Sequence, residues 1–228
     1  KMGGPAMSIW ASAELSPEVT ASMAIQRPIE ELTEDEAEAI KQHRQSSFGE
    51  SAAIGIGSCE ALRSHYGNGA LLIAIVPSSS STTPLPGEWL AFAVLRHMPD
   101  IVVGGGEAAQ AFPCIGVCSV IAIRRGQGYG RQLMDAVRMV MADEFPGYQA
   151  LGFTNSTGFF AKCEGWGTLP DFINAFEYVD PSTGEHALDD DGDAFFLQPN
   201  SDLGNRLVEE TTRLAAWPVE RQHGSEVP

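Results

Sequence analysis

The order of apolar and polar positions predicts a chain of mixed α/β class. Residues 70–76 and 89–95 are almost continuously apolar, which is typical of buried strands, and the proline- and serine-rich residues 77–87 between them predict a loop. Residues 32–42 carry a threonine followed by acidic residues, which is a start signal for a helix. The remaining pattern predicts strands at residues 115–123, 148–154, 175–179 and 193–198, helices at 131–143 and 157–163, and a loop or hairpin end at 102–110. We expect the last two strands to pair around an acidic turn and to close a mixed sheet.

Length and composition favour one compact domain. The chain has 228 residues, of which 43% are hydrophobic, and this is enough to bury a sizeable core. Residues 1–7 lack the apolar region of a signal peptide, so we interpret them as an artificial extension before a native start at Met7 and residues 8–228 as the domain. No apolar stretch approaches the roughly 20 residues that cross a bilayer, and we expect a cytoplasmic protein without membrane contact.

Cysteine, histidine and aspartate spacings indicate neither a metal site nor a hydrolase. The four cysteines form no Cys-x-x-Cys pair, and the five histidines are scattered, so zinc, a disulfide framework and a Ser/His/Asp triad have no support. Asp189, Asp191 and Asp193 have the spacing of the first ligands of a calcium loop. However, Ala194 and Asn200 stand where such a loop needs glycine and glutamate. We therefore predict no bound metal.

The charge distribution argues against nucleic acid and for a cationic partner. Thirty acidic and fourteen basic residues give a net charge of −16, which repels nucleic acid and anionic membranes. Solubility alone is an alternative explanation of an acidic surface. The acidic residues concentrate at 30–38 and 185–193, whereas arginines gather at 124–131. This separation is expected if an anionic cofactor and a cationic substrate occupy different sites.

A glycine-rich segment carries the most specific chemistry. Residues 124–131 read Arg-Arg-Gly-Gln-Gly-Tyr-Gly-Arg and lie between a predicted strand and a predicted helix. Three glycines let backbone N–H groups point at an anion, and the following helix adds the positive end of its dipole. The spacing fits neither the P-loop nor the dinucleotide fingerprint. A strand-to-helix turn that uses glycine for geometry alone remains the alternative.

The motif Arg125-x-x-Gly128-x-Gly130 resembles the pyrophosphate loop of GNAT-fold N-acetyltransferases. Two further features, the pair Gly165-Trp166 and the run of residues 189–192 (Asp-Asp-Asp-Gly) before an apolar strand, are similar to the aminoglycoside 2'-N-acetyltransferases. The resemblance covers about residues 30–200. It implies the GNAT fold, a single domain with a mostly antiparallel sheet flanked by helices, with an acidic hairpin at 180–198 and a C-terminal extension at 199–228.

The resemblance also implies functional roles, with acetyl-CoA as the cofactor. Asp190 and Glu50 are the candidate catalytic carboxylates. The implied substrate-binding residues are Gly116, Val117, Asp189, Asp190 and Asp191, although the family carries a Glu-Gly pair where Gly116 and Val117 stand. The implied cofactor-binding residues are Cys118, Ser119, Val120, Arg125, Gly126, Gln127, Gly128, Tyr129, Gly130, Arg131 and Asn155. A homodimer is consistent with the same resemblance, and Trp217 has a counterpart near the family's C-terminus.

These residues lead to the hypothesis of acetyl-CoA-dependent N-acetylation of a polycationic amine. An aminoglycoside-like amino sugar is the favoured acceptor. A GNAT enzyme acting on a polyamine, and an acyl-CoA-binding protein without turnover, are the alternatives. An amine with a pKa of about 10 must lose its proton before it attacks a thioester, and a carboxylate can accept that proton. Many GNAT enzymes protonate the leaving thiolate with a tyrosine, but Phe160 or Ala161 occupies that position here.

Overall fold

The computed structural model describes residues 10–11, 21–79, 85–103, 110–169, 176–179, 186–188, 193–197 and 219–220. Contacts along the chain group into two compact units. Unit 1 holds residues 1–96 and 118–137, and unit 2 holds residues 97–117 and 138–228. The long strands β4 (Ala91–Val103) and β5 (Gln110–Ala122) and the helix α3 (Tyr129–Glu144) therefore contribute to both units.

In unit 1 the strand order is β1–β2–β3–β4–β5. It uses β1 (Trp10–Ala11), β2 (Ser22–Pro28), β3 (Leu71–Pro77) and parts of β4 and β5. The pairs β1–β2, β2–β3 and β3–β4 are antiparallel. Side chains alternate across this sheet: Leu72, Ala74 and Val76 join one core cluster, and Ile73 and Ile75 are buried outside it.

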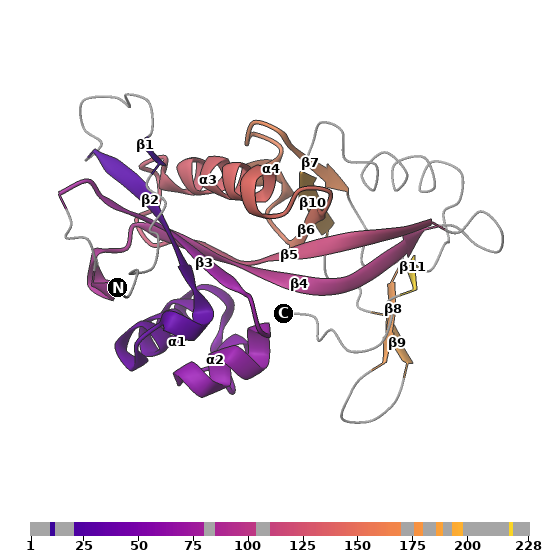
Figure 1. Cartoon of the computed structure of the whole chain (residues 1–228), viewed down its shortest axis with the longest axis horizontal. Helices are drawn as coiled ribbons and strands as arrows, with labels where there is room; N and C mark the ends of the chain where they lie inside the picture. Colours follow the sequence, from indigo (N-terminus) through magenta and orange to yellow (C-terminus); the bar gives the residue numbers. More distant parts are fainter. Residues whose placement is uncertain are drawn as a thin grey trace, which may run out of the picture. The chain divides into compact units, whose positions relative to one another are not determined.

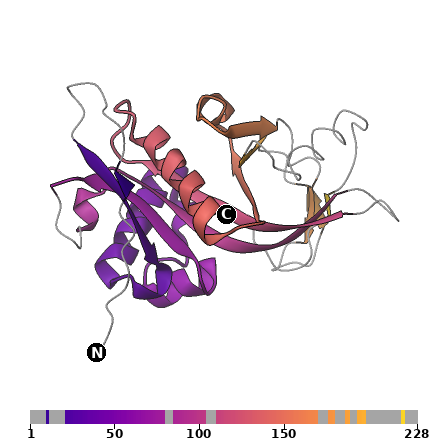
Figure 2. The ribbon, with the colours of Figure 1, turned by 45° about the horizontal axis from the view of Figure 1, so that its top comes forward.

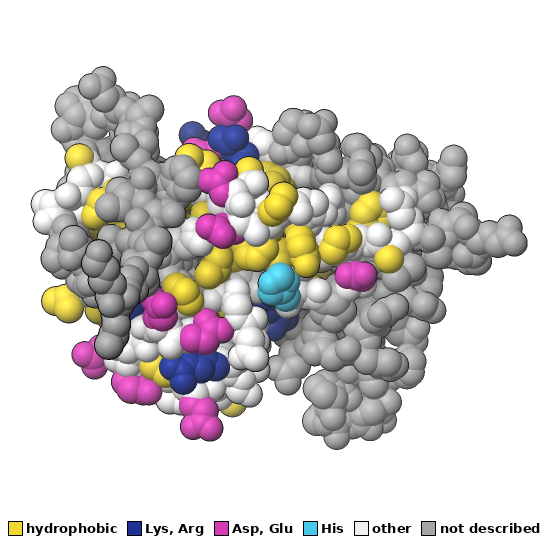
Figure 3. Space-filling view, in the orientation of Figure 1, with side chains coloured by type: hydrophobic (Ala, Val, Ile, Leu, Met, Phe, Trp, Pro, Cys, Tyr) yellow, Lys and Arg dark blue, Asp and Glu magenta, His cyan; other side chains and the backbone are white. Residues whose placement is uncertain are grey.

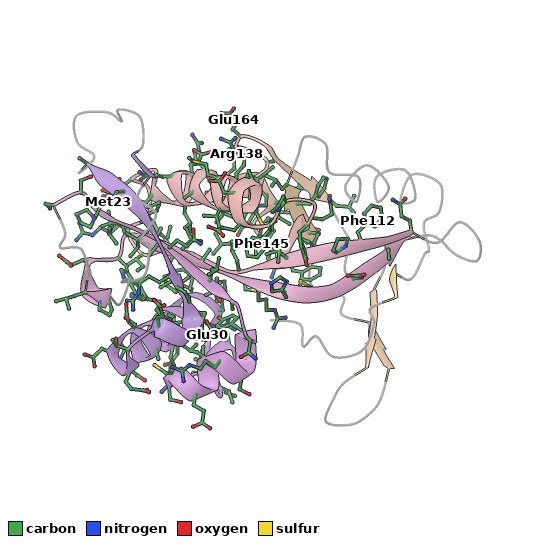
Figure 4. The ribbon with its side chains drawn as sticks, in the orientation of Figure 1. Met23, Glu30, Phe112, Arg138, Phe145 and Glu164 are labelled. Carbon is green, nitrogen blue, oxygen red and sulfur yellow. The ribbon has the colours of Figure 1, made fainter. Side chains whose placement is uncertain are left out.

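Helices cover both faces of the unit 1 sheet (Figures 1 and 2). The helices α1 (Glu34–Phe48) and α2 (Cys59–Tyr66) lie on one face, and the first turns of α3 lie on the other. Thr33 and Glu36 form a capping box that fixes the start of α1. Glu30, labelled in Figure 4, accepts a hydrogen bond from the Gly69 backbone N–H (2.6 Å) and thereby ties the entry to α1 to the exit of α2. Short 3₁₀ turns complete the unit: η1 (Ile29–Glu31), η2 (Glu50–Ala53) and η3 (Pro86–Glu88).

Unit 2 has the strand order β5–β6–β10–β7. It uses β6 (Gln149–Thr154), β7 (Trp166–Leu169) and β10 (Asp193–Leu197), with the short helix α4 (Thr157–Phe160) after β6. The strand β6 pairs in parallel with β5, and β10 pairs antiparallel with both β6 and β7. A separate sheet has the order β11–β8–β9, from β8 (Phe176–Val179), β9 (His186–Leu188) and β11 (Val219–Glu220).

The structure confirms the mixed α/β class with a mostly antiparallel sheet and flanking helices, but it corrects the closing hairpin. The predicted strands at 175–179 and 193–198 do not pair with each other. The first, β8, pairs with β9, whereas β10 lies between β6 and β7. Most of the acidic hairpin expected at 180–198, namely residues 180–185, 189–192 and 198, lies outside the described residues. Ala194, Phe195 and Phe196 are consecutive and all buried, so both faces of β10 are covered, as is typical of a strand inside a sheet.

Residues 102–110 were predicted as a loop or hairpin end. The strand β4 ends at Val103 and β5 begins at Gln110. Residues 104–109 between these strands lie outside the described residues. The predicted helix at 131–143 begins earlier, at Tyr129, and the sequence reading missed β2 and α2 entirely.

Candidate functional site

The glycine-rich turn between β5 and α3 is an exposed loop. Arg124, Arg125, Gly126, Gln127 and Gly128 are all exposed. Gly126 and Gly128 have φ values of 76° and 85°, and a Cβ placed on either would meet no atom within 4 Å. Glycine is therefore required there by backbone conformation, and the space that a side chain would fill stays open. Backbone N–H groups of Ile123 and Arg124 donate to the Leu90 carbonyl at 3.0 and 3.2 Å, which fixes the start of the loop.

The loop leads directly into α3. The Gln132 N–H donates to the Gly128 carbonyl at 3.1 Å, so the helix-type bonding begins at the last loop glycine. Tyr129 and Gly130 are buried while Arg131 is exposed. N–H groups of a first helical turn have no partner within the helix and, with the helix dipole, attract anions.

Three arginines, Arg124, Arg125 and Arg131, lie in and next to this turn. Within the described part of the chain, the ion pairs are Arg27–Glu36 and Lys41–Glu38, and neither involves Arg124, Arg125 or Arg131. The Tyr129 hydroxyl is also without a hydrogen-bond partner there, although its side chain is fully buried. The turn thus combines exposed guanidinium groups, which form no ion pair with any described carboxylate, with glycine backbone geometry, and both favour a phosphate group.

The strand β5 before the loop carries a backbone irregularity at Ser119. With φ of 52°, Ser119 is the one residue other than glycine in the left-handed region among those that the structure describes. Cys118 is buried, and burial raises the pKa of its thiol, against the opposing effect of the Arg96 and Arg44 guanidiniums. Val120 is half-buried. The residues predicted to line the cofactor therefore include a strained position, which sequence reasoning did not identify.

The parallel pairing of β5 with β6 is short. It covers Cys114–Gln149, Ile115–Ala150 and Gly116–Leu151, although β5 itself continues to Ala122. Gly116 and Val117, predicted to bind substrate, are both buried. A Cβ on Gly152 would lie 2.6 Å from the Val117 carbonyl oxygen, so these two backbones approach closely just beyond the paired residues.

The region after β6 lacks the phenol that the resemblance leads one to look for. Asn155 is exposed after β6. Phe160 in α4 is buried and stacks on Phe195, and it also contacts Phe159 edge-on. Ala161 is exposed. Phe160 thus serves as packing within unit 2.

Of the candidate catalytic and substrate-binding carboxylates, Glu50 is the one that the structure describes. Glu50 is exposed at the start of η2, next to α1. Asp189, Asp190 and Asp191 lie outside the described residues, as does Trp217. On the face seen in Figure 3, other Asp and Glu side chains gather over α1 and α2, where Glu31, Glu34 and Asp35 are exposed. Within the described ranges, no group of three or more His, Cys, Asp or Glu side chains is arranged to hold a metal ion.

Sequence reasoning missed a buried polar cluster on the α1–α2 side of unit 1. Its members are Arg44, Tyr66 and Ser119. A signal was present in the helical spacing: Arg44 follows Ala37 and Ile40 on the same face of α1, and all three are buried. A cation on an apolar helix face needs polar partners, so its presence there predicts a buried network.

No family model matches the sequence, and no curated protein matches it. Among solved structures, an acyl-CoA N-acyltransferase from Pseudomonas aeruginosa is similar at 15% identity, covering 76% of this chain and 96% of its own, with a TM-score of 0.45. ElaA of Escherichia coli is similar at 13% identity, covering 77% and 98%, with a TM-score of 0.47. Arabidopsis thaliana NAA60, solved in complex with acetyl-CoA, is similar at 14% identity, covering 76% and 96%, with a TM-score of 0.43. None of the helices in the described ranges is long and apolar enough to span a membrane.

Proposed function

We propose that the protein is an acetyl-CoA-dependent N-acetyltransferase. The observation that carries this proposal is the turn between β5 and α3, where two glycines with positive φ face open space beside exposed arginines. A turn used for geometry alone does not need several exposed arginines that form no ion pair with any carboxylate the structure describes. A pyrophosphate uses these arginines together with the loop backbone, because it accepts backbone N–H bonds and pairs with guanidinium groups.

The residues in and before this loop can be assigned to successive parts of acetyl-CoA. Gly126, Gly128 and the first turn of α3 would hold the pyrophosphate, with Arg125 and Arg131 neutralising it. The backbone of β5 from Cys118 to Val120 would contact the pantetheine arm. When bound, acetyl-CoA supplies an acetyl group activated as a thioester. The backbone N–H groups of β5 would polarise the thioester carbonyl, where negative charge develops during acyl transfer.

The proposed acceptor is a polycationic amine, and an aminoglycoside-like amino sugar modified at its 2' amine is the favoured one. Its support is the resemblance in the Asp-Asp-Asp-Gly run and the excess of acidic over basic residues. Asp190 or Glu50 would bind an ammonium group and accept the proton that the amine loses before attack. The exposed position of Glu50 leaves its carboxylate accessible to such a substrate.

One assay separates the three functional hypotheses. Acetyl-CoA is incubated with the protein and with a panel of amino sugars, polyamines and monoamines, and the release of free thiol is followed. Calorimetry measures acetyl-CoA binding in parallel. Thiol release with amino sugars supports the proposal, and release only with polyamines reassigns the acceptor. Binding without thiol release for any amine identifies an acyl-CoA-binding protein, and absence of binding removes the turn from the cofactor site.

A further inference from the structure

Ser119 adopts a conformation that its side chain disfavours. A φ of 52° brings the Cβ of an L-residue close to the following carbonyl oxygen, and this conformation is unusual inside a strand, where extended conformations are the rule. Strained positions persist only where the surrounding structure holds them, and they cluster at functional sites. We therefore ask which neighbouring residues hold Ser119 in this conformation and which function the conformation serves.

The left-handed conformation of Ser119 changes the direction of side chains along β5. In a regular strand, neighbouring side chains point to opposite faces. Here Cys118 belongs to the core cluster formed with α1 and α2, and the Ser119 hydroxyl bonds to residues of the same two helices. Two consecutive side chains on one face are the signature of a β-bulge, which leaves a backbone position outside the regular ladder.

Three buried polar groups hold this bulge. Arg44 in α1 donates from Nη1 to the Ser119 hydroxyl at 2.6 Å and to the Tyr66 hydroxyl at 2.7 Å. The Tyr66 and Ser119 hydroxyls are themselves 2.9 Å apart, so the three groups close a triangle. Arg44 Nε donates to the Ala52 carbonyl at 2.8 Å, which fixes the guanidinium. We call Arg44, Tyr66 and Ser119 the bulge clamp.

The clamp is costly as a purely structural device. The side chains of all three members are buried, and Arg44 has no ion pair with any carboxylate that the structure describes. A buried guanidinium held by neutral acceptors keeps a desolvation cost that a carboxylate partner would reduce. Burial also raises the pKa of Tyr66, with Arg44 and Ser119 opposing that shift, so the phenol stays protonated. A packed apolar trio would stabilise a plain strand equally well.

We infer that Arg44 and Tyr66 are positioning residues that hold Ser119 of β5 in its left-handed conformation, so that the bulge presents a backbone N–H to the acyl carbonyl. This inference rests on the proposed function, because β5 is the strand assigned to the acyl arm. The clamp acts through the backbone at Ser119. It also couples the α1–α2 layer to β5, since two of its members come from these helices.

A double-mutant cycle tests the clamp. Glycine adopts positive φ without strain, so a bulge with glycine at 119 needs no clamp. We expect Arg44→Lys and Tyr66→Phe each to lower kcat about tenfold, with KM for the amine little changed. In the Ser119→Gly background, the same two substitutions should lower kcat by less than about threefold. A purely structural role would instead lower Tm alone or lower kcat equally in both backgrounds, and either result overturns the inference.

Ser22 provides the matched control. Its hydroxyl donates to Gln132 at 2.8 Å and is equally buried, but Ser22 lies in the regular strand β2. Ser22→Ala should lower Tm without lowering kcat. If the Arg44→Lys variant does not fold, the Tyr66→Phe variant alone tests the clamp, because it removes one hydroxyl and keeps the aromatic ring.

A measurement without turnover separates this inference from the proposed function. The Cα and Cβ chemical shifts of a ¹³C-labelled Ser119 report its backbone conformation. Tyr66→Phe should move them from left-handed towards extended values, and unchanged shifts would overturn the clamp. If wild-type protein releases no thiol with any amine, the acetyltransferase proposal fails, and these shifts still decide whether the clamp holds the bulge.

Discussion

The ring of Phe160 lies flat on the ring of Phe195, with the centroids 3.7 Å apart and the ring planes 8° apart. Trp166 packs against the same Phe195 with the ring centroids 5.7 Å apart, and all three rings are buried. Phe195 in turn covers Gly152 in the neighbouring strand β6. An aromatic stack of this kind fixes α4 against β10, and it explains why an apolar residue stands at position 160.

This stack makes Phe160→Tyr an informative substitution. The added hydroxyl would enter a packed apolar layer without a partner, so we expect a loss of about 1–3 kcal/mol in the free energy of unfolding and no gain in kcat. Urea denaturation and the thiol-release assay measure the two quantities. Ala161→Tyr places a phenol at an exposed position and serves as the control for stability. A higher kcat at unchanged stability would show instead that position 160 acts on the leaving thiolate.

Gly152 should be intolerant of any side chain. A Cβ there would lie 2.2 Å from Phe195 Cζ and 2.6 Å from the Val117 carbonyl oxygen, and the latter cannot move without shifting β5. We expect Gly152→Ala to destabilise the fold by about 1–3 kcal/mol or more, measured by urea denaturation. Gly158→Ala is the matched control, because a Cβ there meets no atom within 4 Å and alanine favours the helix α4. Equal stability of the two variants would contradict the close approach.

The fold class was predictable because hydrophobic periodicity reports which segments are buried. The central strands β3 and β6 and the helix α3 have apolar runs with clear ends, and they were placed within about two residues. The partner of β10 was not predictable, because an apolar strand of five residues fits equally well beside β8 or between β6 and β7. Pairing depends on which neighbours complete the core, and single-strand patterns do not contain that information.

The glycine-rich turn between β5 and α3 was predictable for a similar reason. Consecutive residues build it, so its glycine spacing survives in the sequence as a local motif. The bulge clamp joins positions 44, 66 and 119, which are separated by 22 and 53 residues. Only the fold brings them together. Nor does the identity of Ser119 reveal its backbone angle, because serine is common in strands and turns alike.

The loop glycine offers the most direct test of cofactor binding. Gly128→Ala should weaken acetyl-CoA binding about tenfold or more, because alanine disfavours φ of 85° and places a methyl group in the space assigned to pyrophosphate. Calorimetry on the folded variant measures the affinity. Gly67→Ala carries the same backbone cost at φ of 83°, also with open space, but it lies at the end of α2. Equal affinities for both variants would remove the loop from the site.

His65 should make stability depend on pH. Burial, together with the Arg44 and Arg96 guanidiniums, lowers the pKa of His65 to about 4 from an ordinary 6.5. Between these values the unfolded chain takes up a proton that the folded protein refuses, so the free energy of unfolding falls as pH decreases from 6.5 towards 4. Above pH 6.5 His65 is neutral in both states, so its titration makes no contribution to the pH dependence of stability there.

The variant His65→Gln removes this contribution. Urea denaturation at several pH values should show a smaller loss of stability between pH 6.5 and 4.5 in His65→Gln than in the wild type. Between pH 7 and 8 the two proteins should differ by a constant amount, which serves as the internal control. Parallel curves over the whole range would show that the His65 imidazole titrates alike in the folded and unfolded chains.

The acceptor proposal is tested at Asp190. If this carboxylate binds an ammonium group of an amino sugar, Asp190→Asn should raise KM about tenfold or more, because a lost charge-assisted hydrogen bond costs roughly 1.5–3 kcal/mol. Acetyl-CoA affinity should stay nearly the same, since the carboxylate would contact only the amine. Asp143→Asn, at the exposed end of α3, removes the same charge elsewhere and controls for the change in net charge.

Raising the ionic strength should weaken the binding of a polycationic acceptor to the wild type more than the binding of a monoamine, and this difference should be smaller in Asp190→Asn. An unchanged KM would mean that the acidic run is a solvated turn and that the ammonium is recognised elsewhere, with Glu50→Gln as the next variant to measure.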